Sequence, residues 1–203
     1  AAHSPAIGQP THGKRAEASR SFDRLLERSL DKDQAGFLRG KALYESGLFE
    51  EALSTLESVA APQPGLHLEK GKVFVSLRRA ADAEASLRAA VAEAPLESEA
   101  NYFLGALLVQ QDRAAEGIPF LDTARKSRPD FWGARYYLGR AFLQTHRSAQ
   151  AIAHLEAARA ARPGEPQIDY HLPRAYQAAG RPAEATAALA RFRAAQASRQ
   201  QAE

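Results

Sequence analysis

The sequence predicts an all-α solenoid, a linear stack of antiparallel helix pairs, and three observations predict it. Residue types return every 34 positions over the central and C-terminal parts of the 203-residue chain. Within each period, apolar residues recur at helical spacing in two segments separated by a polar turn. A proline ends the second segment of three periods, at Pro95, Pro129 and Pro163. Each helix pair leaves an apolar face that only its neighbours can bury, so the pairs must stack.

Composition fits a folded protein and excludes several kinds of chemistry. Hydrophobic residues make up 45% of the chain and charged residues 25%, which is enough for a buried core. The absence of cysteine excludes disulfides, thiolate metal sites and thiol nucleophiles. The net charge of +3 comes from 27 basic and 24 acidic residues mixed along the chain, so nucleic acid is not an expected partner. No window reaches the roughly 18 consecutive apolar residues of a membrane span.

The first 30 residues are expected to precede the stack. Residues 1–14 are polar, with Pro5, Gly8 and Pro10, and predict a flexible arm. A helix over residues 15–30 would cover the N-terminal face of the stack. The chain has no methionine, even at its alanine-rich start, as after signal-peptide cleavage or trimming. We expect a periplasmic or extracellular location, with a cytoplasmic one as the alternative.

The period divides the rest of the chain into five repeats, over residues 33–63, 64–97, 98–131, 132–165 and 166–199, before a polar tail at 200–203. Gly105 and Gly139 keep the 34-residue step, and the step from Gly40 to Gly71 is 31 residues, so the first repeat is shortened. The leucines of the second helices and the tyrosines of the first helices keep the step too: Leu87, Leu121, Leu155 and Leu189, and Tyr102, Tyr136 and Tyr170.

These residues resemble the tetratricopeptide repeat family, whose 34-residue unit carries a Leu-Gly pair, small residues in both helices and a closing proline. The resemblance implies a right-handed α-solenoid of about five repeats with an extra N-terminal helix. It also implies a protein-protein interaction scaffold rather than an enzyme. The sequence departs from the family at the aromatic fourth position of the repeat, where His67, Asn101, Arg135 and Asp169 stand.

In this family the first helices line a concave groove that binds peptides. Carried over position by position, the groove residues of this chain are Phe37, Lys41, Tyr44, Lys72, Tyr102, Tyr136, Arg140, Tyr170 and Arg174. Tyrosine rings beside lysine and arginine favour a partner protein or an extended, acidic peptide. Packing of the tyrosines is the plain alternative. Stacking of the rings on a glycan is another alternative, for an exported protein. No asparagine stands where the family's chaperone-tail clamp requires one.

The C-terminal end of the stack is the second candidate contact. Pro173 replaces the glycine of the first helix and predicts a kink. Leu189 and Phe192 lie in a last helix that no further helix covers, so they are candidates for an end-to-end contact between copies. Such a contact gives an oligomer, or a filament where it does not close.

No catalytic, metal or cofactor site is predicted. The six histidines are scattered and none pairs at the i, i+4 spacing that places two imidazoles on one metal ion. The sequence contains no HExxH, phosphate-binding loop or dinucleotide fingerprint.

Overall fold

The computed structural model describes residues 31–200, apart from the side chains of residues 198 and 199. The predicted arm, the predicted helix over 15–30 and the last three residues lie outside this range. The described residues form α-helices and no strands, which confirms the predicted all-α class. The helices are α2 (Lys32–Glu45), α3 (Phe49–Glu57), α4 (Leu66–Ser76), α5 (Ala80–Glu93), α6 (Ser98–Gln110), α7 (Ala114–Ser127), α8 (Trp132–Gln144), α9 (Ser148–Ala161), α10 (Pro166–Ala178) and α11 (Pro182–Gln200). Over this part of the chain, no helix is both long and apolar enough to span a bilayer.

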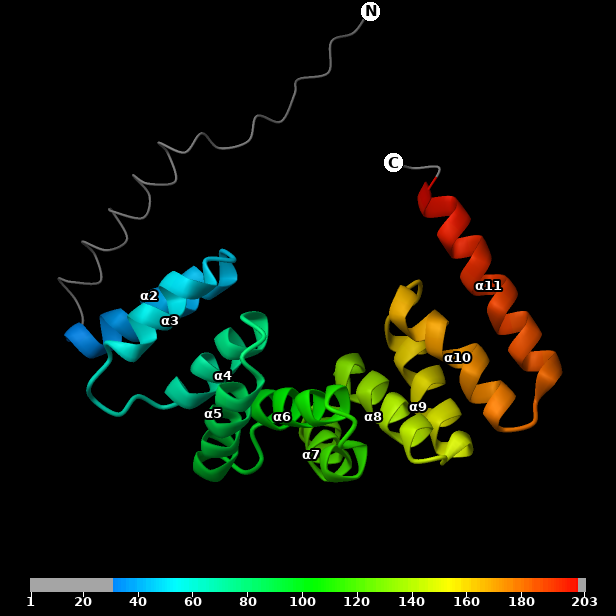
Figure 1. The fold of residues 1–203 in the computed structure, drawn as a ribbon, viewed down its shortest axis with the longest axis horizontal. Coiled ribbons are helices and arrows are strands. Elements are labelled where there is room, and N and C mark those ends of the chain that lie inside the picture. The colour runs from blue at the N-terminus through cyan, green and yellow to red at the C-terminus, as the bar shows by residue number, and fades with distance from the viewer. Residues whose placement is uncertain (1–30, 201–203) are drawn as a thin grey trace, which may run out of the picture.

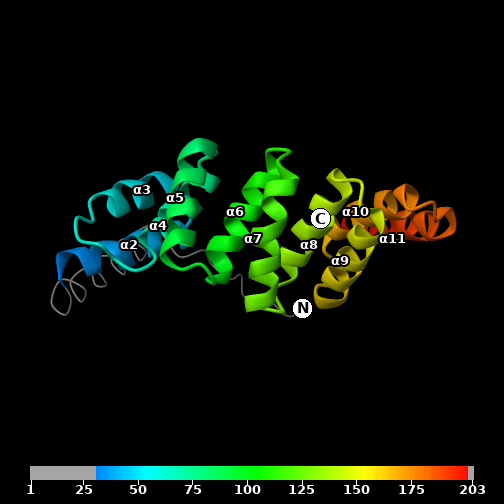
Figure 2. The same cartoon turned by 90° about the horizontal axis from the view of Figure 1, so that it is seen from below.

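The helices pair in chain order into five hairpins that form a curved row (Figure 1). Seen from below, the hairpins follow one another along the row (Figure 2). Each first helix contacts the first helix of the next hairpin, from α2 to α10, and no second helix of the described range contacts another second helix. The first helices therefore lie on the inner side of the curve.

A glycine in the first helix lets each of the first four hairpins close. A Cβ atom added at Gly40, Gly71, Gly105 or Gly139 would lie only 2.5–2.7 Å from the leucine opposite. These leucines, on the second helices, are completely buried: Leu56, Leu87, Leu121 and Leu155. The 34-residue ladders of glycine and leucine therefore mark the contact between the two helices of one hairpin.

The fifth hairpin differs at this contact. Pro173 occupies the glycine position, and the opposing Leu189 is 37% exposed where its four counterparts are 0% exposed. α10 is assigned as one helix through Pro173, and the kink stays a prediction. A proline ring in place of a hydrogen atom leaves less room for Leu189.

An arginine stands directly before the second helix of four hairpins. The backbone N–H of Arg79, Arg113, Arg147 and Arg181 donates to a carbonyl near the end of the preceding helix at 2.7–2.9 Å. The side chains of Arg79, Arg113 and Arg181 then bind a carboxylate three residues later, on Asp82, Glu116 and Glu184, at 2.8–2.9 Å. A carboxylate in the first turn also suits the helix dipole. These arginines thus fix the helix start.

Two of the four polar residues at the fourth repeat position bind the link that precedes their own repeat. Asn101 is 1% exposed and its amide donates to the carbonyls of Pro95 and Glu97 at 2.9 and 2.8 Å. Arg135 donates to the carbonyl of Pro129 at 3.3 Å. Hydrogen bonds to the link replace the aromatic packing that the family has at this position.

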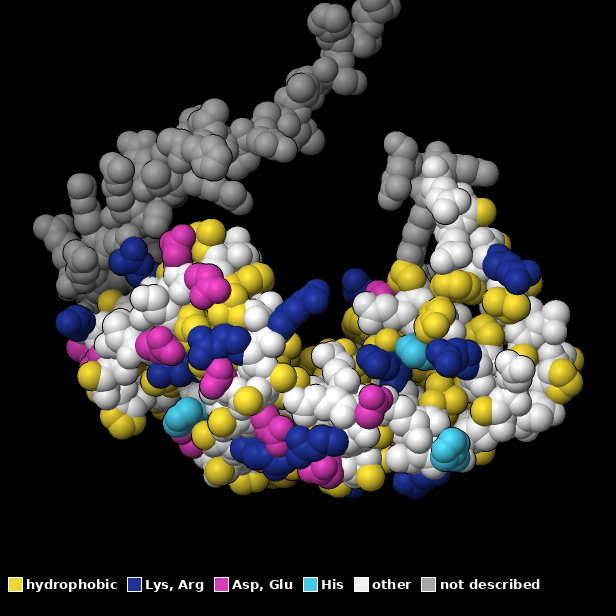
Figure 3. Space-filling model, in the orientation of Figure 1, with side chains coloured by type: hydrophobic (Ala, Val, Ile, Leu, Met, Phe, Trp, Pro, Cys, Tyr) yellow, Lys and Arg dark blue, Asp and Glu magenta, His cyan; other side chains and the backbone are white. Residues whose placement is uncertain are grey.

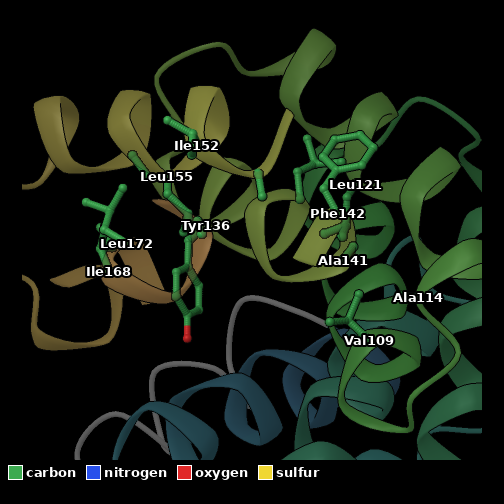
Figure 4. Packing of buried hydrophobic residues seen from close by; sticks show 14 of the residues in the cluster. Val109, Ala114, Leu121, Tyr136, Ala141, Phe142, Ile152, Leu155, Ile168 and Leu172 are labelled. Carbon is green, nitrogen blue, oxygen red and sulfur yellow. The ribbon is translucent and has the colours of Figure 1, made fainter. Parts of the chain in front are cut away.

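The buried apolar residues run through all five hairpins without a break at a repeat boundary. One cluster joins the first three hairpins and a second joins the third to the fifth. In the second cluster, the ring of Tyr136 lies beside Leu155, Ile168 and Leu172 while its hydroxyl points away from them (Figure 4). Tyr136 is therefore part of the core as well as of the inner surface.

Candidate binding groove

Aromatic rings form a continuous series of contacts along the inner surface, from the third hairpin to the last. Consecutive ring centroids lie 5.0–5.9 Å apart, at a distance where aromatic pairs attract. The series joins α6, α8, α10 and α11 in the order Tyr102, Tyr137, Tyr136, His171, Tyr170 and Phe192. Three predicted groove tyrosines are therefore brought together, with three rings that the groove prediction did not include.

The three tyrosines differ in how much of each side chain is exposed to a ligand. Tyr136 is only 4% exposed and Tyr102 is partly buried, and burial raises the pKa of both phenols. Tyr170 is 49% exposed. Packing in the core therefore accounts for the tyrosine at position 136. Tyr170 has the most exposed ring of the series.

Phe192 faces inward rather than out of the end of the stack. Its ring lies 5.9 Å from the ring of Tyr170, and it is partly buried. Of the two residues predicted for an end-to-end contact, Phe192 thus joins the aromatic series and Leu189 is the exposed one.

The predicted groove cations of the first two hairpins already have acidic partners. Glu69 on α4 is 4% exposed and lies 3.4 Å from the Lys41 amine and 3.0 Å from the Lys72 amine. The Lys72 amine also lies 3.6 Å from Glu99 on α6. Burial lowers the pKa of Lys72, but the hydrogen bond and charge of Glu69 and the charge of Glu99 outweigh burial and raise it.

Predicted aromatic residues of these hairpins lie beside the same lysines. The Lys41 amine is 5.5 Å from the ring centre of Phe37, and the Lys72 amine is 5.0 Å from that of Tyr44. Acidic residues and rings of the chain itself therefore surround these cations. The N-terminal half of the groove is close to neutral.

The groove cations of the last two hairpins have rings beside them and no acidic partner. Arg140 on α8 lies 5.2 Å from the ring centre of Tyr137, and Arg174 on α10 lies 5.8 Å from that of Tyr170. Neither guanidinium forms an ion pair with any residue of the described range. Both line one pocket of about 450 Å³, together with Leu143, Gln144, His171 and Ala178.

His171 is a functional candidate that is not among the predicted groove residues. It lines this pocket and touches the rings of Tyr136 and Tyr170. Burial, and then the charges of Arg140 and Arg174, lower the pKa of His171 to about 4. The sequence does contain a signal for this residue, because Phe103, Tyr137 and His171 keep the 34-residue step.

The surface view shows the same contrast between the two halves. Over the C-terminal half, a histidine lies between two cationic side chains beside exposed apolar atoms, whereas acidic and basic side chains mix over the N-terminal half (Figure 3). Within residues 31–200, no group of three or more histidine or acidic residues could hold a metal ion.

Comparison with known families identifies the class of protein. Models described as tetratricopeptide repeat match residues 11–67, 68–124 and 108–168. The chain belongs to the tetratricopeptide repeat family, and it is thereby a protein-interaction scaffold.

Solved structures with the same fold include several of MamA. MamA from Desulfovibrio magneticus RS-1 superposes with a TM-score of 0.74 at 20% identity, over 83% of this chain and 97% of that one. MamA AMB-1 gives a TM-score of 0.74 at 22% identity, over 80% and 98%. MamA MSR-1 gives 0.71 at 22% identity, over 85% and 99%. At these identities the likeness shows the fold. No curated protein matches the sequence.

Proposed function

We propose that this scaffold binds an extended segment of a partner protein along the inner surface of its first helices. The series of rings from Tyr102 to Phe192 carries the proposal. Aromatic rings provide large contact area at little cost in side-chain entropy, and Tyr170 is open to a ligand. The scaffold has no proposed catalytic role.

A photo-crosslinking residue at position 170 tests this proposal. Tyr170 is 49% exposed, so p-benzoylphenylalanine fits there without disturbing the core. Leu96 is the matched control, because it is a 75% exposed apolar residue in the link between two repeats, outside the groove. Tyr136 is unsuitable, because its replacement would open the core.

We expect irradiation in an extract of the producing cells to yield a specific adduct at position 170 that position 96 does not yield. A synthetic peptide that spans the crosslinked segment of the partner should then compete. The same set of adducts at both positions, or no adduct at position 170, would show that the groove does not recruit the partner.

Self-association through the C-terminal end is a second candidate function, supported by the exposure of Leu189. Sedimentation velocity over a concentration series tests it. Leu189→Glu should abolish association, while Leu96→Glu should leave association unchanged. A chain that sediments as a monomer at every concentration contradicts this candidate.

A further inference from the structure

The two halves of the groove carry different charge. The last two repeats, residues 132–199, contain ten arginines, four carboxylates and no lysine, whereas the first two, residues 33–97, contain seven cations and ten carboxylates. The groove lysines of the first two hairpins are paired with Glu69 and Glu99, whereas the groove arginines of the last two hairpins have no carboxylate partner within residues 31–200. An anionic group of a ligand is therefore attracted to the last two hairpins.

The pocket between α8 and α10 can hold one such group. Arg140 and Arg174 occupy equivalent positions one repeat apart and both line the pocket. A guanidinium presents its N–H groups in a planar fork that matches a carboxylate. The rings of Tyr137 and Tyr170 lie beneath the two guanidiniums and hold them over the groove.

The surroundings also determine which residue should accompany the carboxylate. Tyr170 is the exposed ring next to the pocket, and its own ring neighbour is Phe192 on α11. A flat, apolar side chain beside the carboxylate can stack on this ring. The fitting ligand is thus a peptide carboxylate next to an aromatic residue, supplied either by a chain terminus or by an acidic side chain.

A carboxylate at this place would change the charge around His171. The groups that face the imidazole are Arg140 and Tyr136 on α8, and Arg174 and Tyr170 on α10. Partial burial, and then the charges of Arg140 and Arg174, lower the pKa of the free imidazole and so favour its neutral form. A bound carboxylate neutralises that field and adds a negative charge, which favours the imidazolium.

We propose that Arg140, His171 and Arg174 form a proton-coupled carboxylate anchor, which binds an acidic group of the partner and protonates His171 as it does so. The inference rests on the proposed function, since the anchor is part of the same groove. By linkage, affinity for the carboxylate rises as pH falls.

Three small probes test the anchor. N-acetylphenylalanine carries a terminal carboxylate, N-acetyl-aspartyl-phenylalanine amide carries a side-chain carboxylate, and N-acetylphenylalanine amide carries none. Titrations followed by ¹⁵N NMR should give saturable shifts of the Arg140 and Arg174 side chains with one or both acids. The neutral amide should bind at least about tenfold more weakly, as expected for loss of two charge-assisted hydrogen bonds. The stronger acid identifies the source of the carboxylate.

Matched variants show whether carboxylate binding depends on the two pocket arginines or only on the net charge of the protein. Arg140→Gln and Arg174→Gln should each weaken binding of the acids about tenfold, which corresponds to one charged hydrogen bond. Arg162→Gln removes the same charge from an exposed position in the link before α10 and should bind like the wild type. Equal binding of the neutral amide, or equal loss in the Arg162 variant, would overturn the anchor.

Calorimetry at pH 7.5 and pH 5.0 tests the proton coupling, because the probes stay ionised across this range. We expect tighter binding at pH 5.0, by at most about tenfold per pH unit, with measurable proton uptake in buffers of different ionisation enthalpy. His171→Gln should keep the preference for carboxylate and lose the pH dependence. Affinity that does not change with pH, or a pH dependence that persists in this variant, would overturn the coupling.

The outcomes also separate the anchor from the proposed function. Partner crosslinking at position 170 without carboxylate preference would leave the groove function and remove the anchor. A carboxylate preference without a crosslinked partner would leave the anchor and contradict the groove function.

Discussion

At the scale of single residues, the tight turns of the hairpins depend on one backbone conformation. The same position of each hairpin turn has a positive φ, of 58–77°. Gly47 and Gly180 hold it in the first and last hairpins, whereas Arg78, Asp112 and His146 hold it in the middle three. This left-handed conformation costs about 1–2 kcal/mol for a residue with a Cβ atom.

Gly180→Ala should therefore destabilise the protein by about 1 kcal/mol. A Cβ atom at Gly180 would meet nothing within 4 Å, so the cost comes from the backbone and not from a clash. Urea unfolding measures it. The reverse change, His146→Gly, should be neutral or stabilising by up to about 1 kcal/mol. Destabilisation by both changes would contradict the turn conformation.

His171 should make the folded state sensitive to acid. Its pKa of about 4 in the folded protein lies below the unfolded value of 6.5, so the unfolded chain binds the proton more tightly. The contribution of His171 to stability is therefore complete above pH 6.5 and is lost as pH falls towards 4, by at most about 1.4 kcal/mol per pH unit. NMR titration should give the low pKa. His171→Gln should reduce the acid-dependent loss of stability measured by urea unfolding.

At the scale of elements, the glycine-leucine contact inside each of the first four hairpins is the main packing device. Leu121 is completely buried against Gly105, and Leu121→Ala should cost about 2–5 kcal/mol in the free energy of unfolding. Urea unfolding measures the loss. Leu96→Ala, at the 75% exposed link position, is the control and should change stability by less than about 0.5 kcal/mol. Equal effects would mean that Leu121 is not in the core.

The sequence predicted the elements well because packing imposes the period. The ladders of Gly105 and Leu121 reflect a contact that recurs in the first four hairpins, and the ladder of Tyr136 recurs in the last three, so both were visible without a structure. The ion pairs Lys41–Glu69 and Lys72–Glu99 were not visible, because each joins two different helices and the two glutamates keep no common position in the repeat. The burial of Tyr136 was also hidden, since exposure depends on how closely neighbouring repeats stack.

At the scale of the whole molecule, stability should decrease towards the C-terminal end. In a stack, each repeat is stabilised by its neighbours, and among the described residues the fifth repeat contacts another repeat on one side. Its hairpin also lacks the glycine contact, since Pro173 faces the partly exposed Leu189. The fifth repeat should therefore open most readily among the described repeats.

Hydrogen exchange followed by mass spectrometry tests whether the fifth repeat opens more readily than the central repeats. Amides of α10 and α11 should exchange faster than those of α6 and α7, which lie in the middle of the stack. Pro173→Gly should slow exchange in α11 if the proline holds the hairpin open. Uniform protection along the row would contradict a weak C-terminal end.

The uneven distribution of basic residues has a practical consequence. All six lysines, Lys14, Lys32, Lys41, Lys70, Lys72 and Lys126, precede the last two repeats. Reagents directed at amines therefore modify only the first three repeats and the segment before them. A protein coupled through its amines to a sensor surface is attached by that part of the chain, and the chemistry leaves the side chains of α8 to α11 unmodified for an analyte.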